Sequence, residues 1–314
     1  MAWEYEILFD VDDMDGMERL TPLEREARLA DPDRWKQESS GIRKGSMGYR
    51  TRTIKAGPRL EAEIFPLFGR EAETRARDAK KRITPEKIQK YNDEKARRNL
   101  IRLMDANFGA GDLHITLTYE GEQPEWQRAE KDVKNFIGRL RRYRQRMGLP
   151  ALKYIYALED RAEDREKRTH CHFVTTGDMD RQEVERIWKE GTGKRKGSGA
   201  GFANCDTLQP TREGLEALAR YIYDQNKGAP REKGRKKYVP SKNLTKPKTR
   251  TSDTKVTKGR VKKMSQVFAT DESEARRIME SLYPGYEFVR GTAKGSDIIT
   301  DGVYIRVLMR KKGG

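Results

Sequence analysis

Residues 169–174 read Thr169-His170-Cys171-His172-Phe173-Val174, and this stretch carries two of the three histidines in a chain of 314 residues. The aromatic and branched residues after His172 favour a β-strand over a helix. Side chains alternate between the faces of a strand, so we expect His170 and His172 on one face and Cys171 on the other. Two neutral imidazoles on one face can bind a divalent ion. The alternative is a pair of half-buried strand histidines.

The segments around this stretch predict an antiparallel sheet with helices. Strands are expected over residues 112–119, 152–159 and 202–208, and helices over residues 125–147, 180–190 and 211–225. The order strand, helix, strand, strand, helix, strand is the split β-α-β plan, so the predicted fold class is α+β with the helices on one face of the sheet. The polar face of the first helix carries five arginines: Arg139, Arg141, Arg142, Arg144 and Arg146.

The chain is expected to consist of four segments. Residues 1–108 form an N-terminal accessory region, with a hairpin around Gly57-Pro58 and charged helices, one of which begins near Pro85. Residues 109–230 contain the sheet, residues 231–263 a basic arm, and residues 264–314 a small C-terminal α+β segment. That last segment is predicted to contain a helix over 272–282 and strands over 286–290 and 303–310.

The charge of the chain predicts a polyanionic partner. Lysine and arginine number 67 against 50 acidic residues, a formal net charge of +17, and nucleic acid is the commonest partner of such a chain. A membrane surface is the rival interpretation. There is no apolar run long enough to span a bilayer and no basic start followed by an apolar core, so we expect a cytoplasmic protein without a membrane partner. Two cysteines make no disulfide framework and are expected to be reduced.

The basic arm concentrates much of this charge. Residues 231–263 contain fourteen lysines and arginines and two acidic residues. They have little to bury, so we expect an extended arm that contacts nucleic-acid phosphates; a solvated tail is the alternative. The candidate DNA-binding residues are Arg235, Lys236, Lys237, Lys242, Lys246 and Lys248.

A metal site is predicted where two strands meet. Glu159 ends one strand and His170 begins the next, so a carboxylate and the imidazoles of His170 and His172 can converge on Mg²⁺ or Mn²⁺ and leave coordination positions open. Zinc bound through Cys171 or Cys205 is the weaker competitor, because Cys171 should face away and Cys205 lies on another strand. Glu159 could instead pair with a neighbouring basic residue.

A nucleophile is expected on the helix over 211–225, which carries Tyr221 and Tyr223. A phenol has a pKa of about 10 and needs a polarised phosphate and a nearby base or cation before it can attack. Tyrosines on such helices are usually packing residues, and we expect one of this pair to be one.

These motifs together resemble the HUH-endonuclease superfamily, and in particular the rolling-circle replication initiator (Rep) proteins of phages and mobile elements. The resemblance covers most of the chain. It rests on three motifs in order: the strand over 114–119, His170-Cys171-His172 and Tyr221. Further similarity lies in residues 53–57, 60–66, 241–244 and 282–286.

The resemblance implies a fold, a reaction and partners. An ion held by Glu159, His170 and His172 would polarise a phosphate of single-stranded DNA at a replication origin, and Tyr221 would attack it to give a 5′-phosphotyrosine. The family commonly has lysine three residues after its tyrosine, where this chain has Asp224; Lys227 is the nearest candidate and suits Tyr223 better, so Tyr223 is kept as second nucleophile. No Walker-type loop is present, so unwinding and synthesis would fall to a host helicase and polymerase.

Two other functions fit the sequence. One is a basic nucleic-acid-binding protein without catalysis, for which the histidines would be dispensable. The other is a transposase or relaxase on the same scaffold, which would share the chemistry but use a different DNA substrate.

Overall fold

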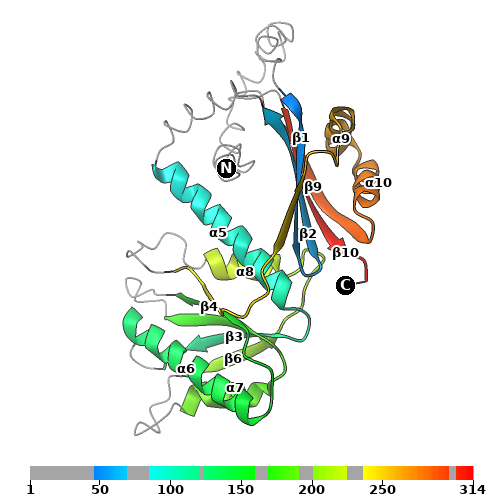
Figure 1. Cartoon of the computed structure of the whole chain (residues 1–314). Helices are drawn as coiled ribbons and strands as arrows, with labels where there is room; N and C mark the ends of the chain where they lie inside the picture. Colours follow the sequence, from blue (N-terminus) through cyan, green and yellow to red (C-terminus); the bar gives the residue numbers. More distant parts are fainter. Residues whose placement is uncertain are drawn as a thin grey trace. The chain divides into compact units, whose positions relative to one another are not determined.

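The structure is a computed structural model that describes residues 46–68, 85–120, 123–159, 169–190, 201–224, 236–296 and 302–313. The chain forms two compact units (Figure 1). Residues 97–247 form the central unit, and residues before 97 and after 247 form the terminal unit, with the boundary inside helix α5 (Pro85–Asn107). Each unit contains a five-stranded antiparallel sheet, which confirms the predicted α+β class.

The central unit has the predicted order of elements. The order runs β3 (Leu113–Thr118), α6 (Trp126–Arg146), β4 (Tyr154–Glu159), β5 (His170–Thr175), α7 (Arg181–Glu190), β6 (Ala203–Thr207), α8 (Glu216–Asp224) and β7 (Val239–Pro240). The sheet order is β6-β3-β5-β4-β7, with every neighbouring pair antiparallel. Strand β5 therefore lies between β3 and β4, which is the split β-α-β arrangement.

Helices α6 and α7 cover one face of this sheet, and the main core lies between them and the strands (Figure 1). Alternate residues of β5 contribute to it, Cys171 and Phe173 among them, and they pack with Phe136 and Trp188. Helix α8 lies on the opposite face. Its start is held to the end of α5, because the Leu215 amide donates to Asp105 Oδ1 at 2.8 Å. The second face of the sheet is thus left to the polar residues of β3, β4 and β5.

Arg144 differs from the other arginines of α6. The predicted polar face placed it in solvent, but its side chain is 2% exposed and donates to both carboxylate oxygens of Asp178, at 2.5 and 2.6 Å. Its Nε also donates to the Pro150 carbonyl. The expectation of an exposed arginine was wrong, because the end of α6 packs against the turn between β5 and α7, which helical periodicity cannot report.

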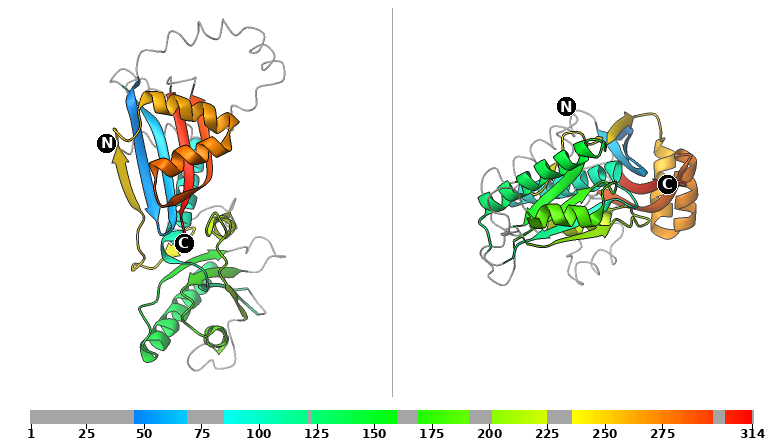
Figure 2. Two further views of the ribbon diagram at one scale, coloured as in Figure 1. Left: turned by 90° about the vertical axis from the view of Figure 1, so that its right-hand side faces the viewer. Right: turned by 90° about the horizontal axis from the view of Figure 1, so that it is seen from below.

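The terminal unit combines both ends of the chain. Its elements are β1 (Ser46–Ala56), β2 (Arg59–Phe68), β8 (Lys248–Ser252), α9 (Lys258–Thr270), α10 (Glu272–Leu282), β9 (Tyr286–Ser296) and β10 (Gly302–Lys311). The sheet order is β8-β1-β2-β10-β9, and α9 and α10 cover one face of it (Figure 2). The hairpin predicted around Gly57-Pro58 is confirmed, with Gly57 at a positive φ of 58°.

This arrangement divides the chain differently from the four predicted segments. Strand β2 of the hairpin pairs with β10, so the N-terminal hairpin and the C-terminal strands share one sheet and one apolar core. Part of the predicted basic arm is also folded, since β8 pairs with β1. Pairing between strands so far apart in the chain leaves no signal in local periodicity. Of the predicted charged helices, α5 is described from Pro85, and residues 69–84 lie outside the described residues.

Candidate active site

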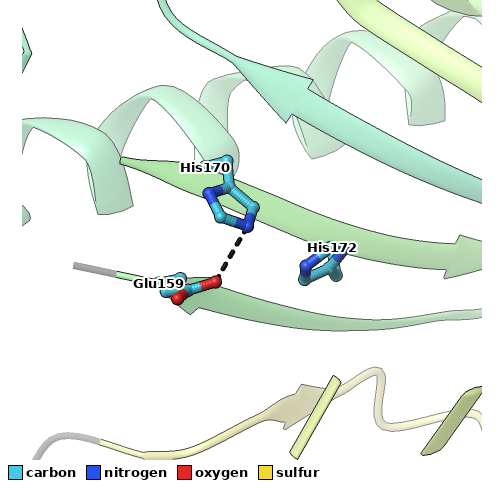
Figure 3. A group of neighbouring side chains, drawn as sticks. All are labelled: Glu159, His170 and His172. Atoms are coloured by element: carbon cyan, nitrogen blue, oxygen red, sulfur yellow. Dashed lines mark ion pairs between the residues drawn. The ribbon is translucent and has the colours of Figure 1, made fainter. Parts of the chain in front are cut away.

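Three ligand-type side chains converge on the face of the central sheet that α6 and α7 leave uncovered. His170 and His172 alternate with Cys171 along β5, as predicted, and Glu159 lies directly opposite His170 in the β4–β5 pair. Directly opposite residues of antiparallel strands project to the same face with side chains in reach of each other. The hairpin therefore brings the carboxylate and both imidazoles together (Figure 3).

The geometry of this cluster suits a divalent ion. His170 Nε2 lies 2.8 Å from Glu159 Oε2, and one ligand atom from each of Glu159, His170 and His172 lies within 4.8 Å of the other two. The Glu159 side chain is 1% exposed and that of His170 is 21% exposed. A carboxylate so deeply buried requires a compensating positive charge. One carboxylate and two imidazoles fit Mg²⁺ or Mn²⁺ and leave coordination positions for water and phosphate oxygens.

His114 supports the cluster from the next strand. Its Nε2 lies 3.1 Å from His172 Nδ1, and the two rings stack with centroids 5.2 Å apart and an angle of 24°. Burial lowers the pKa of His114, and the charge of Asp206 offsets part of that shift. A neutral His114 can accept a hydrogen bond from His172 Nδ1, which leaves His172 Nε2 as the metal-binding nitrogen. The sequence placed His114 in a strand motif but gave no sign of this contact.

The cysteines do not join the site. Cys171 and Cys205 belong to the core beneath α6 and α7, on the other face of the sheet. Burial raises the pKa of Cys171, and burial together with Glu185 raises the pKa of Cys205 to about 12. Protonated thiols are poor metal ligands, so the alternative of a zinc site built from these cysteines is not supported.

The two candidate tyrosines have different surroundings. The Tyr221 ring lies against His172, with centroids 5.1 Å apart at 70°, and the residue is 48% exposed. Tyr223 is 3% exposed, and Lys237 Nζ lies 4.2 Å from its ring centroid. Two residues apart on a helix point in different directions. Tyr221 is therefore next to the ligand cluster and open to solvent, whereas Tyr223 is a packing residue.

The predicted DNA-binding residues are only partly described. Lys236, Lys242, Lys246 and Lys248 are exposed, and Lys237 is half-buried over Tyr223. Arg235 and Lys227 lie outside the described residues. The chain between Lys242 and Lys246 is held in place, because Asn243 donates to the Leu152 carbonyl and the Thr245 amide donates to Asn107.

The comparisons with known proteins agree with this arrangement. Residues 112–226 match a family model of replication-associated proteins, the ORF2 type, and this segment runs from β3 to α8 and contains every residue of the cluster. No curated protein and no solved structure matches the chain. The match supports a replication initiator of the Rep type. Among the described helices, none is both long and apolar enough to cross a membrane.

Proposed function

We propose that the protein initiates rolling-circle replication by metal-dependent nicking and joining of single-stranded DNA at an origin, as the resemblance to HUH endonucleases implies. The observation that carries this proposal is the position of Tyr221, whose ring lies against His172 of the ligand cluster. A phenol next to a site for a phosphate-binding ion is the arrangement that phosphotyrosine chemistry requires.

Each residue has a distinct task in this reaction. Glu159, His170 and His172 hold Mg²⁺ or Mn²⁺, which supplies Lewis-acid polarisation of the scissile phosphate. Tyr221 Oη forms a bond to phosphorus while the bond from phosphorus to the 3′ oxygen breaks. The phenol proton is released and the departing oxygen is protonated, which gives a 5′-phosphotyrosine and a free 3′-hydroxyl. Attack by a 3′-hydroxyl on the phosphotyrosine reverses the step and rejoins DNA without an external energy source.

His114 acts through His172 as a positioning residue. The contact between His114 Nε2 and His172 Nδ1 selects the tautomer in which His172 presents Nε2 to the ion. The stacked rings also limit rotation of the His172 side chain.

The test of this proposal separates the two tyrosines. The protein is incubated with Mn²⁺ and labelled single-stranded origin DNA, and covalent adducts are resolved under denaturing conditions. Tyr221→Phe should abolish the adduct, and the matched control Tyr223→Phe should form it, because Tyr223 is buried beneath Lys237. An adduct that persists in Tyr221→Phe and disappears in Tyr223→Phe would contradict the assignment of the nucleophile.

The non-catalytic alternative makes the opposite prediction for the ligand cluster. A basic nucleic-acid-binding protein would form no adduct with any origin strand and would bind DNA equally well after His170→Ala or His172→Ala.

A further inference from the structure

A group of four cations lies at the edge of the terminal sheet. In the β1–β8 pair, Lys248 is directly opposite Lys55 and Arg250 is directly opposite Thr53, so these side chains share one face. Strand β8 is the gold strand beside blue β1 in the left view of Figure 2. Lys255 follows β8 and lies close enough to Lys55 for the two charges to interact. We call Lys55, Lys248, Arg250 and Lys255 the edge patch.

Two tyrosines form a floor for the edge patch. Lys55 Nζ lies 5.3 Å from the ring centroid of Tyr286, and Lys255 Nζ lies 3.9 Å from that of Tyr283. The Tyr283 hydroxyl is hydrogen-bonded to Thr53 Oγ1 at 3.0 Å, which fixes the ring. Cation–π contacts orient ammonium groups without neutralising them. The lysines are therefore held in place while their charge remains available to an anion.

The arrangement is unfavourable for the protein alone. Like charges directly opposite each other across two strands are destabilising, and burial, together with the proximity of Lys55, lowers the pKa of Lys255. Within the described part of the chain, none of the four cations forms an ion pair. Other cations of the same unit do, as Arg50 with Asp253 and Arg277 with Glu274 show. A bound anion would offset the repulsion.

We propose that the edge patch is a second DNA-contact surface, which binds backbone phosphates separately from the nicking site. Lys248 and Arg250 are two residues apart on a strand, about 6.8 Å, which is about the axial rise of two nucleotides in one strand of a duplex. The patch reads no bases, because phosphate contacts carry no sequence information. The inference rests on the proposed function only in naming DNA as the polyanion, and it assigns a role to the unit that lies outside the family match.

The test measures DNA affinity as a function of salt. Full-length protein carrying Tyr221→Phe, so that no covalent adduct forms, is compared with the same protein carrying Lys55→Gln, Lys248→Gln, Arg250→Gln and Lys255→Gln. Labelled origin DNA is titrated as a single strand and as a duplex. The slope of log affinity against log salt should become shallower by about 0.7 per lost contact for a single strand, or about 3 in total, and by slightly more for a duplex. The double variant Lys55→Gln/Lys248→Gln should lose about half of that slope.

A matched control removes the same charge elsewhere. Lys131→Gln, Arg142→Gln, Arg146→Gln and Lys189→Gln change exposed residues of α6 and α7, which cover the sheet face away from the ligand cluster, and should leave the slope unchanged. An unchanged slope in the edge-patch variant would overturn the inference. Loss of polyglutamate binding with DNA binding intact would overturn it in favour of an acidic protein partner.

The outcome is independent of the nicking reaction. With Tyr221 restored, the edge-patch variant should nick a short saturating oligonucleotide at the wild-type rate. If wild type and variant both fail to nick but differ in salt slope, the proposed function fails and the edge patch stands as a DNA-contact surface.

Discussion

Replacement of His114 tests whether the contact with His172 organises the metal site. The two variants are His114→Phe, which keeps a ring to stack on His172 but removes the nitrogen 3.1 Å from Nδ1, and His114→Gln, whose side-chain carbonyl can still accept. Both keep most of the volume of the imidazole, so the β3 position stays filled.

The expected magnitude follows from the single hydrogen bond that is lost. A neutral hydrogen bond contributes about 0.5–1.5 kcal/mol net, and 1.4 kcal/mol corresponds to a factor of ten in affinity. Loss of a partner that orients a metal ligand typically costs about 10–100-fold in metal affinity. We therefore expect His114→Phe to bind Mn²⁺ about tenfold more weakly than the wild type, and His114→Gln to lie between the two.

Isothermal titration of Mn²⁺ into metal-free protein measures this difference directly and needs no DNA. Thermal unfolding in EDTA is the control for packing, and it should be similar for the two variants because neither leaves a cavity. If His114→Phe binds Mn²⁺ with the wild-type dissociation constant, the contact with His172 does not position the ligand and that part of the reasoning fails.

Two further predictions concern stability. Asp178→Asn should lower the free energy of unfolding by about 2 kcal/mol, less than for a fully buried pair because Asp178 is partly exposed. Arg144 holds the pKa of Asp178 below its usual range, so this stabilisation is present above the unfolded pKa and is lost as the pH falls through the folded one; the variant should show less acid sensitivity in urea titrations. Gly201→Ala should cost at least about 2 kcal/mol, because Gly201 has a φ of +130° and an added Cβ would lie 2.3 Å from the Thr118 carbonyl oxygen. Helical Gly138→Ala, whose added Cβ would meet only the tip of Arg142 at 4.0 Å, should instead stabilise by about 0.5–1 kcal/mol; equal effects of the two glycine changes would contradict this account.

The parts of the site that were predictable are those set by neighbours in the chain. Alternation along one strand put His170 and His172 on one face, and the hairpin between β4 and β5 put Glu159 opposite His170. The strand order of the split β-α-β unit also followed from local patterns, because branched strands and an amphipathic helix keep their periodicity whatever they pack against.

The parts that were not predictable depend on contacts between distant segments. His114 meets His172 only because β3 pairs with β5 in a particular register, with Thr116 opposite His172. Likewise, Tyr221 and Tyr223 were equivalent in the sequence, and the side of α8 that faces the sheet decides which one meets the cluster.

The sequence by itself determined which residue types the molecule can bring to a metal and a phosphate, because side-chain alternation and helical period are properties of short segments. The tertiary structure alone decided that both ends of the chain share a sheet, that Arg144 is buried, and that Lys55 faces Lys248. The physical reason is that strand pairing and register between remote segments are selected by the fit of whole surfaces, to which each segment contributes only part.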